Sequence, residues 1–136
     1  MPAPVPAGHT RGAIVVIGAS HTPDHQAQLI QRFWNEAGGY GARIVICATP
    51  QMQEKSHTYQ VQLQQLETAT ITELVISDRQ LASQSEQWRA IDVATGILLL
   101  APTPNHVAAL LGGTPLATAI RRANASGKTI AGESSS

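Results

Sequence analysis

A serine stands at the end of a short apolar segment near the carboxyl end of the sequence. Residues 128–134 are typical of a buried strand that runs into the pattern Gly-x-Ser, with Gly132 and Ser134 at the two fixed positions. In α/β hydrolytic enzymes a nucleophilic serine is held on a tight turn between a strand and a helix. Such a serine needs a base to accept its proton and donors to bind the oxyanion. We identify no such base within the sequence, so Ser134 is a candidate nucleophile without an assigned partner.

Four histidines were considered as ligands or bases. His106 follows the fourth apolar segment and would approach Ser134 if the fourth and fifth strands are neighbours. His21 and His25 are four residues apart, a spacing that places two zinc ligands on one face of a helix. No glutamate stands between them, and the interpretation we favour for these two and for His57 is a surface or capping histidine. We therefore predict no metal site.

Two further features have a structural and a functional interpretation. The turn Gly18-Ala19-Ser20 could bind a phosphate at a helix N-terminus, but it lacks the full Gly-x-Gly-x-x-Gly pattern. Cys47 lies inside an apolar segment, which favours an inert thiol in the core. We therefore predict no cofactor.

The composition limits the classes of function. The chain has 136 residues, of which 43% are hydrophobic, and nine basic residues balance nine acidic ones. A neutral chain without a basic cluster gives no electrostatic reason to expect nucleic acid or a membrane surface as partner. A single cysteine excludes an intrachain disulfide and suits a cytoplasmic location. Residues 1–11 are rich in proline and alanine and predict a flexible tail before one domain over residues 12–136.

Apolar segments alternate with helical patterns along that domain. The predicted strands cover residues 13–17, 43–48, 74–76, 97–101 and the segment before Ser134. The predicted helices cover residues 26–37, 53–67, a short segment around Trp88 to Ala94, one around Val107 to Leu111, and one that starts after Thr114. We expect Ser20 or Asp24 to cap the first helix. Continuous apolar runs such as residues 13–17 predict strands buried on both faces.

This alternation predicts an α/β fold with a doubly wound, mostly parallel, five-stranded sheet and helices on both faces. Both the flavodoxin-like order 2-1-3-4-5 and the order 3-2-1-4-5 fit the pattern. Ligands of such sheets bind beyond the carboxyl ends of the strands. The candidate substrate-binding residues there are Gly18, Ser20, Thr103, His106 and Glu133.

Five stretches, in order, resemble the cyanophycinase family of serine peptidases. They are Gly12 to Gly18, Ala42 to Ile46, Ala94 to Ile97, Leu110 to Leu116 and Gly127 to Gly132, and the block Leu-Leu-Gly-Gly-Thr-Pro-Leu is the most specific of them. The resemblance implies a fold similar to class I glutamine amidotransferases, here truncated after the fifth strand. It also implies hydrolysis of cyanophycin, an aspartate backbone that carries arginine, or of related aspartyl peptides.

The resemblance implies Ser134 as nucleophile, because the family motif is Gly-Thr-Ser-Ala-Gly. Gly132 takes the place of the first glycine, and Glu133 stands where the family has threonine. Ala101-Pro102-Thr103-Pro104 stands where the family has a Gly-Gly-Asp-Gln loop beside the active site, and prolines cannot donate a backbone N–H. The family's histidine and acidic partners lie in a C-terminal half that would follow Ser136. We therefore expect no hydrolysis by the 136-residue chain alone.

Two alternatives stay open. The first is a non-catalytic binding or regulatory module, with a peptide or small molecule as possible ligand. We expect an unpaired fifth strand to be adhesive, and hence a homo-oligomer or a second chain that completes the fold. The second alternative is that the sequence is a fragment of a longer peptidase.

Overall fold

The computed structural model describes residues 11–18, 22–77, 85–102 and 113–134. Over these ranges strands and helices alternate as the sequence pattern predicts. The strands are β1 (Ile14–Gly18), β2 (Arg43–Ala48), β3 (Thr70–Val75), β4 (Gly96–Leu100) and β5 (Thr129–Ser134). The helices are α1 (Pro23–Glu36), α2 (Gln53–Gln65), α4 (Ser85–Val93) and α6 (Pro115–Ala125), with 3₁₀ turns at Gly39–Gly41 and Pro50–Met52.

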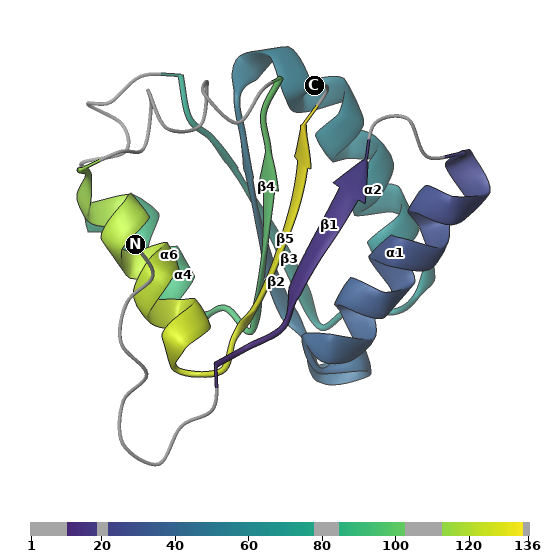
Figure 1. The fold of residues 1–136 in the computed structure, drawn as a ribbon. Coiled ribbons are helices and arrows are strands. Elements are labelled where there is room, and N and C mark those ends of the chain that lie inside the picture. The colour runs from purple at the N-terminus through teal and green to yellow at the C-terminus, as the bar shows by residue number, and fades with distance from the viewer. Residues whose placement is uncertain (1–10, 19–21, 78–84, 103–112, 135–136) are drawn as a thin grey trace.

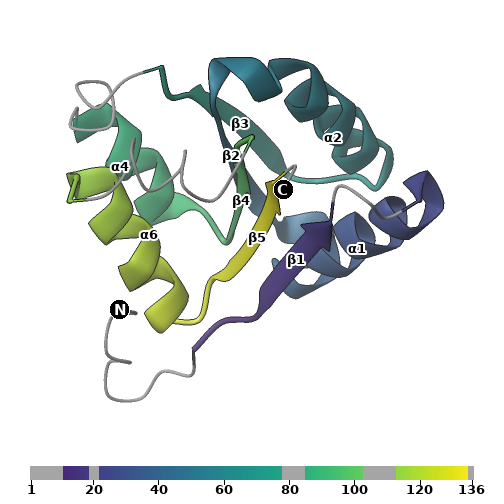
Figure 2. The same ribbon diagram turned by 45° about the horizontal axis from the view of Figure 1, so that its top comes forward.

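The five strands form one parallel sheet in the order β1-β5-β4-β2-β3. The prediction of a doubly wound parallel sheet is confirmed, but both predicted strand orders are wrong. The prediction of an unpaired fifth strand is wrong too, because β5 pairs with β1 on one side and with β4 on the other. The unpaired edges of the sheet therefore belong to β1 and β3 (Figures 1 and 2).

The direction of each connection decides which face of the sheet its helix covers. The chain moves from β1 to β2 and on to β3 in one direction across the sheet, and then returns from β3 to β4 and β5 in the other. Because connections between parallel strands are right-handed, the first two helices lie on one face and the last two on the opposite face. Figure 1 shows α1 and α2 on one side of the sheet and α4 and α6 on the other.

Two helices begin at Thr-Pro pairs. Thr22 accepts a hydrogen bond from the His25 N–H (3.1 Å) and Pro23 is the first residue of α1, so the predicted cap at Ser20 or Asp24 is wrong. Thr114 accepts from the Ala117 N–H (3.3 Å) with Pro115 as the first residue of α6, as predicted. In both cases the proline occupies a position whose N–H would have no partner in the helix.

The sheet separates two hydrophobic clusters. The cluster under α1 and α2 contains Phe33, Tyr59 and Leu63, each at most 1% exposed. The cluster under α4 and α6 contains Cys47, Ile91 and Leu116. Side chains of β2 and β4 alternate between the two clusters, as expected for strands with helices on both faces.

Gly96 lets α1 approach the start of β4. A Cβ atom at this position would lie 2.6 Å from the Cβ of Ala37 and 3.1 Å from the ring of Phe33. Any side chain would therefore push the helix away from the strand.

The two edge strands differ from their predictions. β3 spans six residues and begins at Thr70, whereas only residues 74–76 were predicted. The polar residues Thr70, Thr72 and Glu73 are exposed at the edge of the sheet, so the first half of the strand lacks the continuous apolar run on which the prediction relied. β1 was predicted to be buried on both faces, but Ile14 and Val16 are 64% and 72% exposed. The run of β-branched residues identified the strand correctly but did not indicate that one of its faces is uncovered.

Candidate functional site at the carboxyl ends of the strands

The candidate nucleophile lies at the carboxyl end of an interior strand. Ser134 is the last residue of β5 and is in register with Gly18, the last residue of β1. On the other side of β5, the Ala101 N–H donates to the Glu133 carbonyl (3.2 Å), and one strand further the Thr49 N–H donates to the Leu100 carbonyl (3.1 Å). The ends of four neighbouring strands thus form one edge, at which the fold positions the residue that the sequence singled out.

Three predicted site residues, Ser20, Thr103 and His106, lie outside the described residues. Of the predicted set, the structure brings Gly18, Glu133 and Ser134 together at the ends of β1 and β5. The predicted contact between His106 and Ser134 stays a prediction. The condition for it is met, because β4 and β5 are neighbours.

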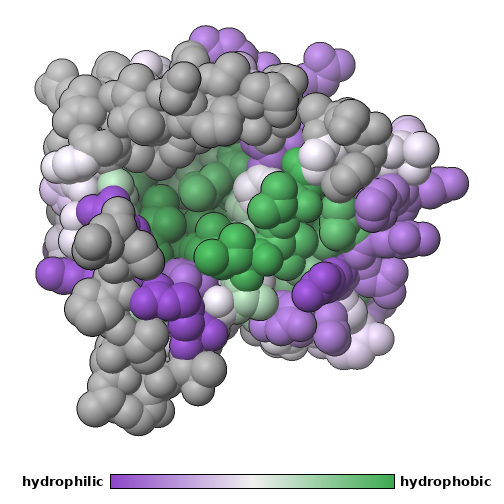
Figure 3. Space-filling model, viewed as in Figure 1, coloured by the Kyte–Doolittle hydropathy of each residue, from purple (hydrophilic) through white to green (hydrophobic). Residues whose placement is uncertain are grey.

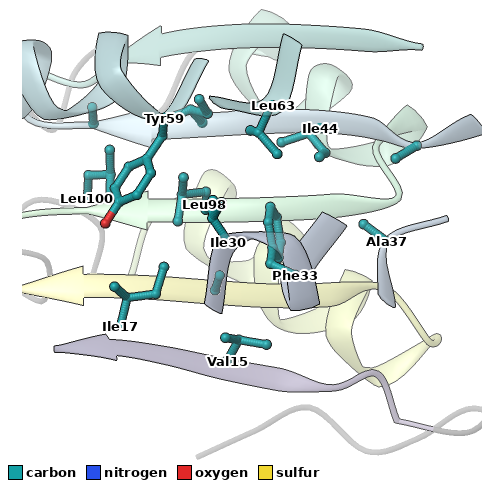
Figure 4. Close-up of a cluster of buried hydrophobic side chains, with 14 residues drawn as sticks. Val15, Ile17, Ile30, Phe33, Ala37, Ile44, Tyr59, Leu63, Leu98 and Leu100 are labelled. Carbon is teal, nitrogen blue, oxygen red and sulfur yellow. The ribbon is translucent and has the colours of Figure 1, made fainter. Parts of the chain in front are cut away.

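The side chain of Glu133 is buried on the α1/α2 side of the sheet. It is 4% exposed, and its Oε2 atom accepts a short hydrogen bond from the hydroxyl of Tyr59, which is itself 1% exposed. Figure 4 shows the Tyr59 ring projecting from α2 across β4 towards β5. A buried carboxylate is costly unless it is paired, so this contact ties the end of β5 to α2.

A lysine completes the pairing of that carboxylate. The Nζ atom of Lys55 lies 3.7 Å from Oε1 of Glu133 and 5.5 Å from the centre of the Tyr59 ring. The same ammonium donates to Oε1 of Gln26 (3.1 Å), and Nε2 of Gln26 donates to the Gly18 carbonyl (3.0 Å). The contacts therefore run without a break from the end of β5, through α2 and α1, to the end of β1. We call Gln26, Lys55, Tyr59 and Glu133 the strand-end network.

The strand-end network holds Tyr59 in its neutral form. Burial raises the pKa of the Tyr59 hydroxyl far above its ordinary value, and the hydrogen bond to Glu133 raises it further. A neutral phenol can donate to the carboxylate, whereas a phenolate would repel it. The network therefore fixes the position of the residue that precedes Ser134. Its groups do not include a neutral histidine that could accept a serine proton.

Thr49 adds a polar group at the same edge. It is 4% exposed, and its Oγ1 atom has no hydrogen-bond partner among the described residues. Buried hydroxyl groups normally have a partner in the protein or in ordered water. A polar group of a ligand, or a water molecule, at the ends of β2 and β4 would satisfy it.

The strand-end network was missed by the sequence analysis. Tyr59 was placed on the inner face of its helix, which is correct, but its partner Glu133 is 74 residues away in the sequence. A buried tyrosine needs a hydrogen-bond partner for its hydroxyl, so the sequence predicted that Tyr59 has a partner but not which residue it is. Nothing in the local pattern of Gln26 or Lys55 separates them from the many other polar residues of α1 and α2.

A groove lies between α4 and α6. It has a volume of about 660 Å³, and its lining includes Trp88, Thr118, Arg122 and Lys128. The Lys128 ammonium donates to the carbonyls of Ile91 (3.0 Å) and Asp92 (2.5 Å), so it ends α4 rather than facing a ligand. Burial lowers the pKa of Lys128. The groove contains none of the residues predicted from sequence.

The other candidates from the sequence are Cys47 and the histidine pair, of which His21 lies outside the described residues. Cys47 is buried, and burial raises the pKa of its thiol to about 12, which confirms the inert core thiol. Within the described ranges no three His, Cys, Asp or Glu side chains come together to hold a metal ion. The helices of the same ranges include none with the length and apolar character needed to cross a membrane.

Comparison with known proteins supports the fold. No family model and no curated protein sequence matches this chain. Among solved structures, the chain is similar to the crystal structure of a peptidase from an acI-B1 actinobacterium, with a TM-score of 0.77 and 19% sequence identity. The match covers 93% of this chain and 55% of the peptidase, so this chain spans about half the length of that protein. The two proteins thus share an α/β fold with a parallel sheet.

Proposed function

We propose that this chain carries the nucleophile of a serine peptidase of the cyanophycinase type, with Ser134 as the attacking residue. The observation that carries the proposal is the position of Gly132-Glu133-Ser134 at the carboxyl end of an interior parallel strand, in register with the end of β1. Open parallel sheets bind their ligands at this edge. The fold shared with a peptidase agrees with the proposal but does not specify a substrate.

The proposed reaction is hydrolysis of an aspartyl-arginine polymer or a related aspartyl peptide. The Ser134 oxygen would attack the carbonyl carbon while a base takes its proton, and the C–N bond would break as the base returns that proton to the leaving amine. Water would then hydrolyse the acyl-enzyme and free Ser134. Among the described residues, the strand-end network beside Ser134 contains no histidine. We therefore expect the base to come from outside those residues, and we expect no turnover by the 136-residue chain alone.

The test compares two lengths of the protein on one substrate. The protein at the length found in its natural source is incubated with cyanophycin, and the β-aspartyl-arginine dipeptides released are measured by mass spectrometry. We expect release by that protein, a loss of about 1,000-fold or more for Ser134→Ala, and none from the isolated 136-residue chain. Unchanged release by Ser134→Ala would reject Ser134 as nucleophile.

A second candidate function is a binding module that lacks catalysis. The apolar surface left open on β1 favours it, since Ile14 and Val16 are 64% and 72% exposed. In that case the source-length protein would release no dipeptide, yet it would retain a ligand or partner in a pull-down with Ser134→Ala as well as with the wild type.

A further inference from the structure

An apolar strip is exposed on β1. Ile14 and Val16 are 64% and 72% exposed, while the residues between and after them, Val15 and Ile17, are at most 3% exposed under α1. The exposed pair therefore faces the opposite side of the sheet, where α4 and α6 lie. Figure 3 shows the apolar area that opens on this side of the molecule, over β1 and β5. Two adjacent β-branched side chains on one face form a patch, not an isolated exposed residue.

The strip continues onto the neighbouring strands. Ile14 is in register with Ile130 and Val16 with Gly132, and Gly132 is in register with Leu99. Ile130 and Leu99 are only partly buried. Among the described residues, a Cβ atom built on Gly132 would meet a single neighbour, the Leu99 carbonyl oxygen at 3.9 Å, so these residues leave the space above Gly132 open. We call these five residues, Ile14, Val16, Leu99, Ile130 and Gly132, the β1–β5 face.

The backbone of β1 is also unpaired on one side. The Ala13 carbonyl accepts from the Ile130 N–H (3.0 Å), which directs alternate residues of β1 towards β5 and directs the N–H and C=O groups of Ile14 and Val16 outwards. β1 ends the sheet, so no strand of the described residues pairs with it there. Its sequence, IVVIG, contains no charged residue or proline of the kind that normally protects an edge.

One occupant accounts for both the open face and the open edge. A second copy that paired along β1 would satisfy the edge but leave the β1–β5 face exposed. A helix alone would cover the face and leave the edge unpaired. A helix followed by a strand does both.

The handedness of connections between parallel strands specifies which side of the sheet such a helix would cover. The chain already moves from β4 to β5 in the direction of β1, with α6 on the α4/α6 side. A right-handed connection from β5 to a strand outside β1 continues in the same direction and must cross the same side of the sheet. Its helix would lie on the β1–β5 face.

We propose that the β1–β5 face binds a helix formed by the polypeptide that continues from β5, and that a sixth parallel strand follows this helix and pairs with the outer edge of β1. The length of the structural neighbour agrees with this, because the chain spans 55% of that peptidase. The proposal does not depend on the chemistry of Ser134, so it can fail or succeed separately from the proposed function.

The test is amide hydrogen exchange on two forms, the 136-residue chain and the protein produced from the source gene at its natural length. In the short chain the Ile14 and Val16 amides exchange rapidly at all protein concentrations. In the longer protein we expect both amides to exchange at least about 100-fold more slowly than in the short chain, because they donate to the sixth strand. Val15, whose backbone faces β5, serves as the internal reference in both forms.

A charged substitution provides the second readout. Val16→Lys leaves the melting temperature of the short chain within about 1 °C of the wild type and lowers that of the longer protein by about 5 °C or more. Val93→Lys is the matched control, since Val93 is 61% exposed on α4, away from the β1–β5 face, and it changes neither form.

Three outcomes would overturn the proposal. Equal exchange of Ile14 and Val16 in the two forms would exclude the sixth strand. Protection that appears in the short chain and grows with concentration would assign the edge to a second copy. A source reading frame that supplies no polypeptide after Ser136 would leave no segment to bind.

Discussion

The two faces of the sheet are covered to different extents. On one face, α1 and α2 follow each other across the sheet, and their cluster includes residues of β1, β5, β4 and β2. On the other face, α4 and α6 cover β2 and β4, while Ile14 and Val16 of β1 remain exposed. The difference arises from the strand order, because the return from β3 to β5 stops one strand short of the edge.

The comparison also separates two kinds of interaction along β5. Towards the covered face, Glu133 is held by Tyr59 and Lys55. Towards the open face, Ile130 is only partly buried, and among the described residues a Cβ atom on Gly132 would meet one atom within 4 Å. Among the described residues, the side-chain contacts that hold the end of β5 therefore come from the α1/α2 side of the sheet.

The largest effect is expected on the covered face, from Tyr59→Phe. The substitution keeps the ring but removes the hydroxyl that donates to Glu133, and leaves a buried carboxylate oxygen without a donor. We expect a loss of about 3 kcal/mol in the free energy of unfolding, measured by urea denaturation.

The control for that substitution removes the carboxylate as well. In the double variant Tyr59→Phe, Glu133→Leu no buried oxygen is left unpaired, and the Lys55 side chain, which is 34% exposed, turns to solvent. Replacing both partners by apolar groups is often nearly neutral, so most of the lost stability should return. A double variant less stable than Tyr59→Phe alone would contradict this account.

A smaller loss is expected where α1 meets β4. In Gly96→Ala the new methyl group would lie 2.6 Å from the Cβ of Ala37, so α1 must shift away from the covered face. We expect a loss of about 2 kcal/mol, which is typical of overpacking. Gly41→Ala is the matched control, because no atom of the described residues lies within 4 Å of a Cβ there. Thermal unfolding of both variants measures the difference.

The sequence pattern predicted the alternation of strands and helices, and it did so through the apolar runs. Both Thr-Pro starts follow from local chemistry, but only Thr114 was recognised, because Ser20 and Asp24 are equally plausible caps beside Thr22. The strand order could not be read from these patterns. Apolar residues show that a strand is buried, but they do not identify its neighbours.

The site was predicted in part for a related reason. Gly-x-Ser after an apolar run is a local signal, and the structure has Ser134 at the end of a strand. The contact between Tyr59 and Glu133 joins residues 74 positions apart, and no local pattern encodes it. The exposure of Ile14 and Val16 depends on β1 lying at the edge, which again follows from the strand order.

Alkaline pH should lower the free energy of unfolding through one buried group on each face of the sheet. The first to act is Cys47, in the cluster under α4 and α6. Burial raises the pKa of Cys47 to about 12, so the folded chain keeps this proton at a pH where the unfolded chain has released it. Its contribution to stability is complete below about pH 8.5 and declines as the pH rises towards 12. Between pH 8.5 and pH 10 we expect the wild type to lose about 1–2 kcal/mol more than Cys47→Ala, measured by urea denaturation at each pH. Parallel curves for the two proteins would contradict the prediction.

Tyr59 extends this decline at higher pH. Its pKa is also raised in the folded state, so its contribution is complete below about pH 10 and is lost above it. Cys47→Ala should therefore become less stable above pH 10 even though it is insensitive to the Cys47 titration, and a further Tyr59→Phe substitution should remove most of that second decline. If the stability of the variant with both Cys47→Ala and Tyr59→Phe still declined above pH 10, other groups would be responsible for the alkaline loss.

The smallest effect tests the open face directly. Val16→Thr in the 136-residue chain should change the free energy of unfolding by about 0.5 kcal/mol or less, because Val16 is 72% exposed and the new hydroxyl stays in water. Val45→Thr is the matched control: Val45 lies under the helices of the same side and is 3% exposed, so its hydroxyl would be buried at a cost of about 1–3 kcal/mol. Urea denaturation of the two variants measures the contrast. Equal losses would mean that Val16 is covered in solution, and the loss for Val16→Thr would then report the stability of whatever covers it.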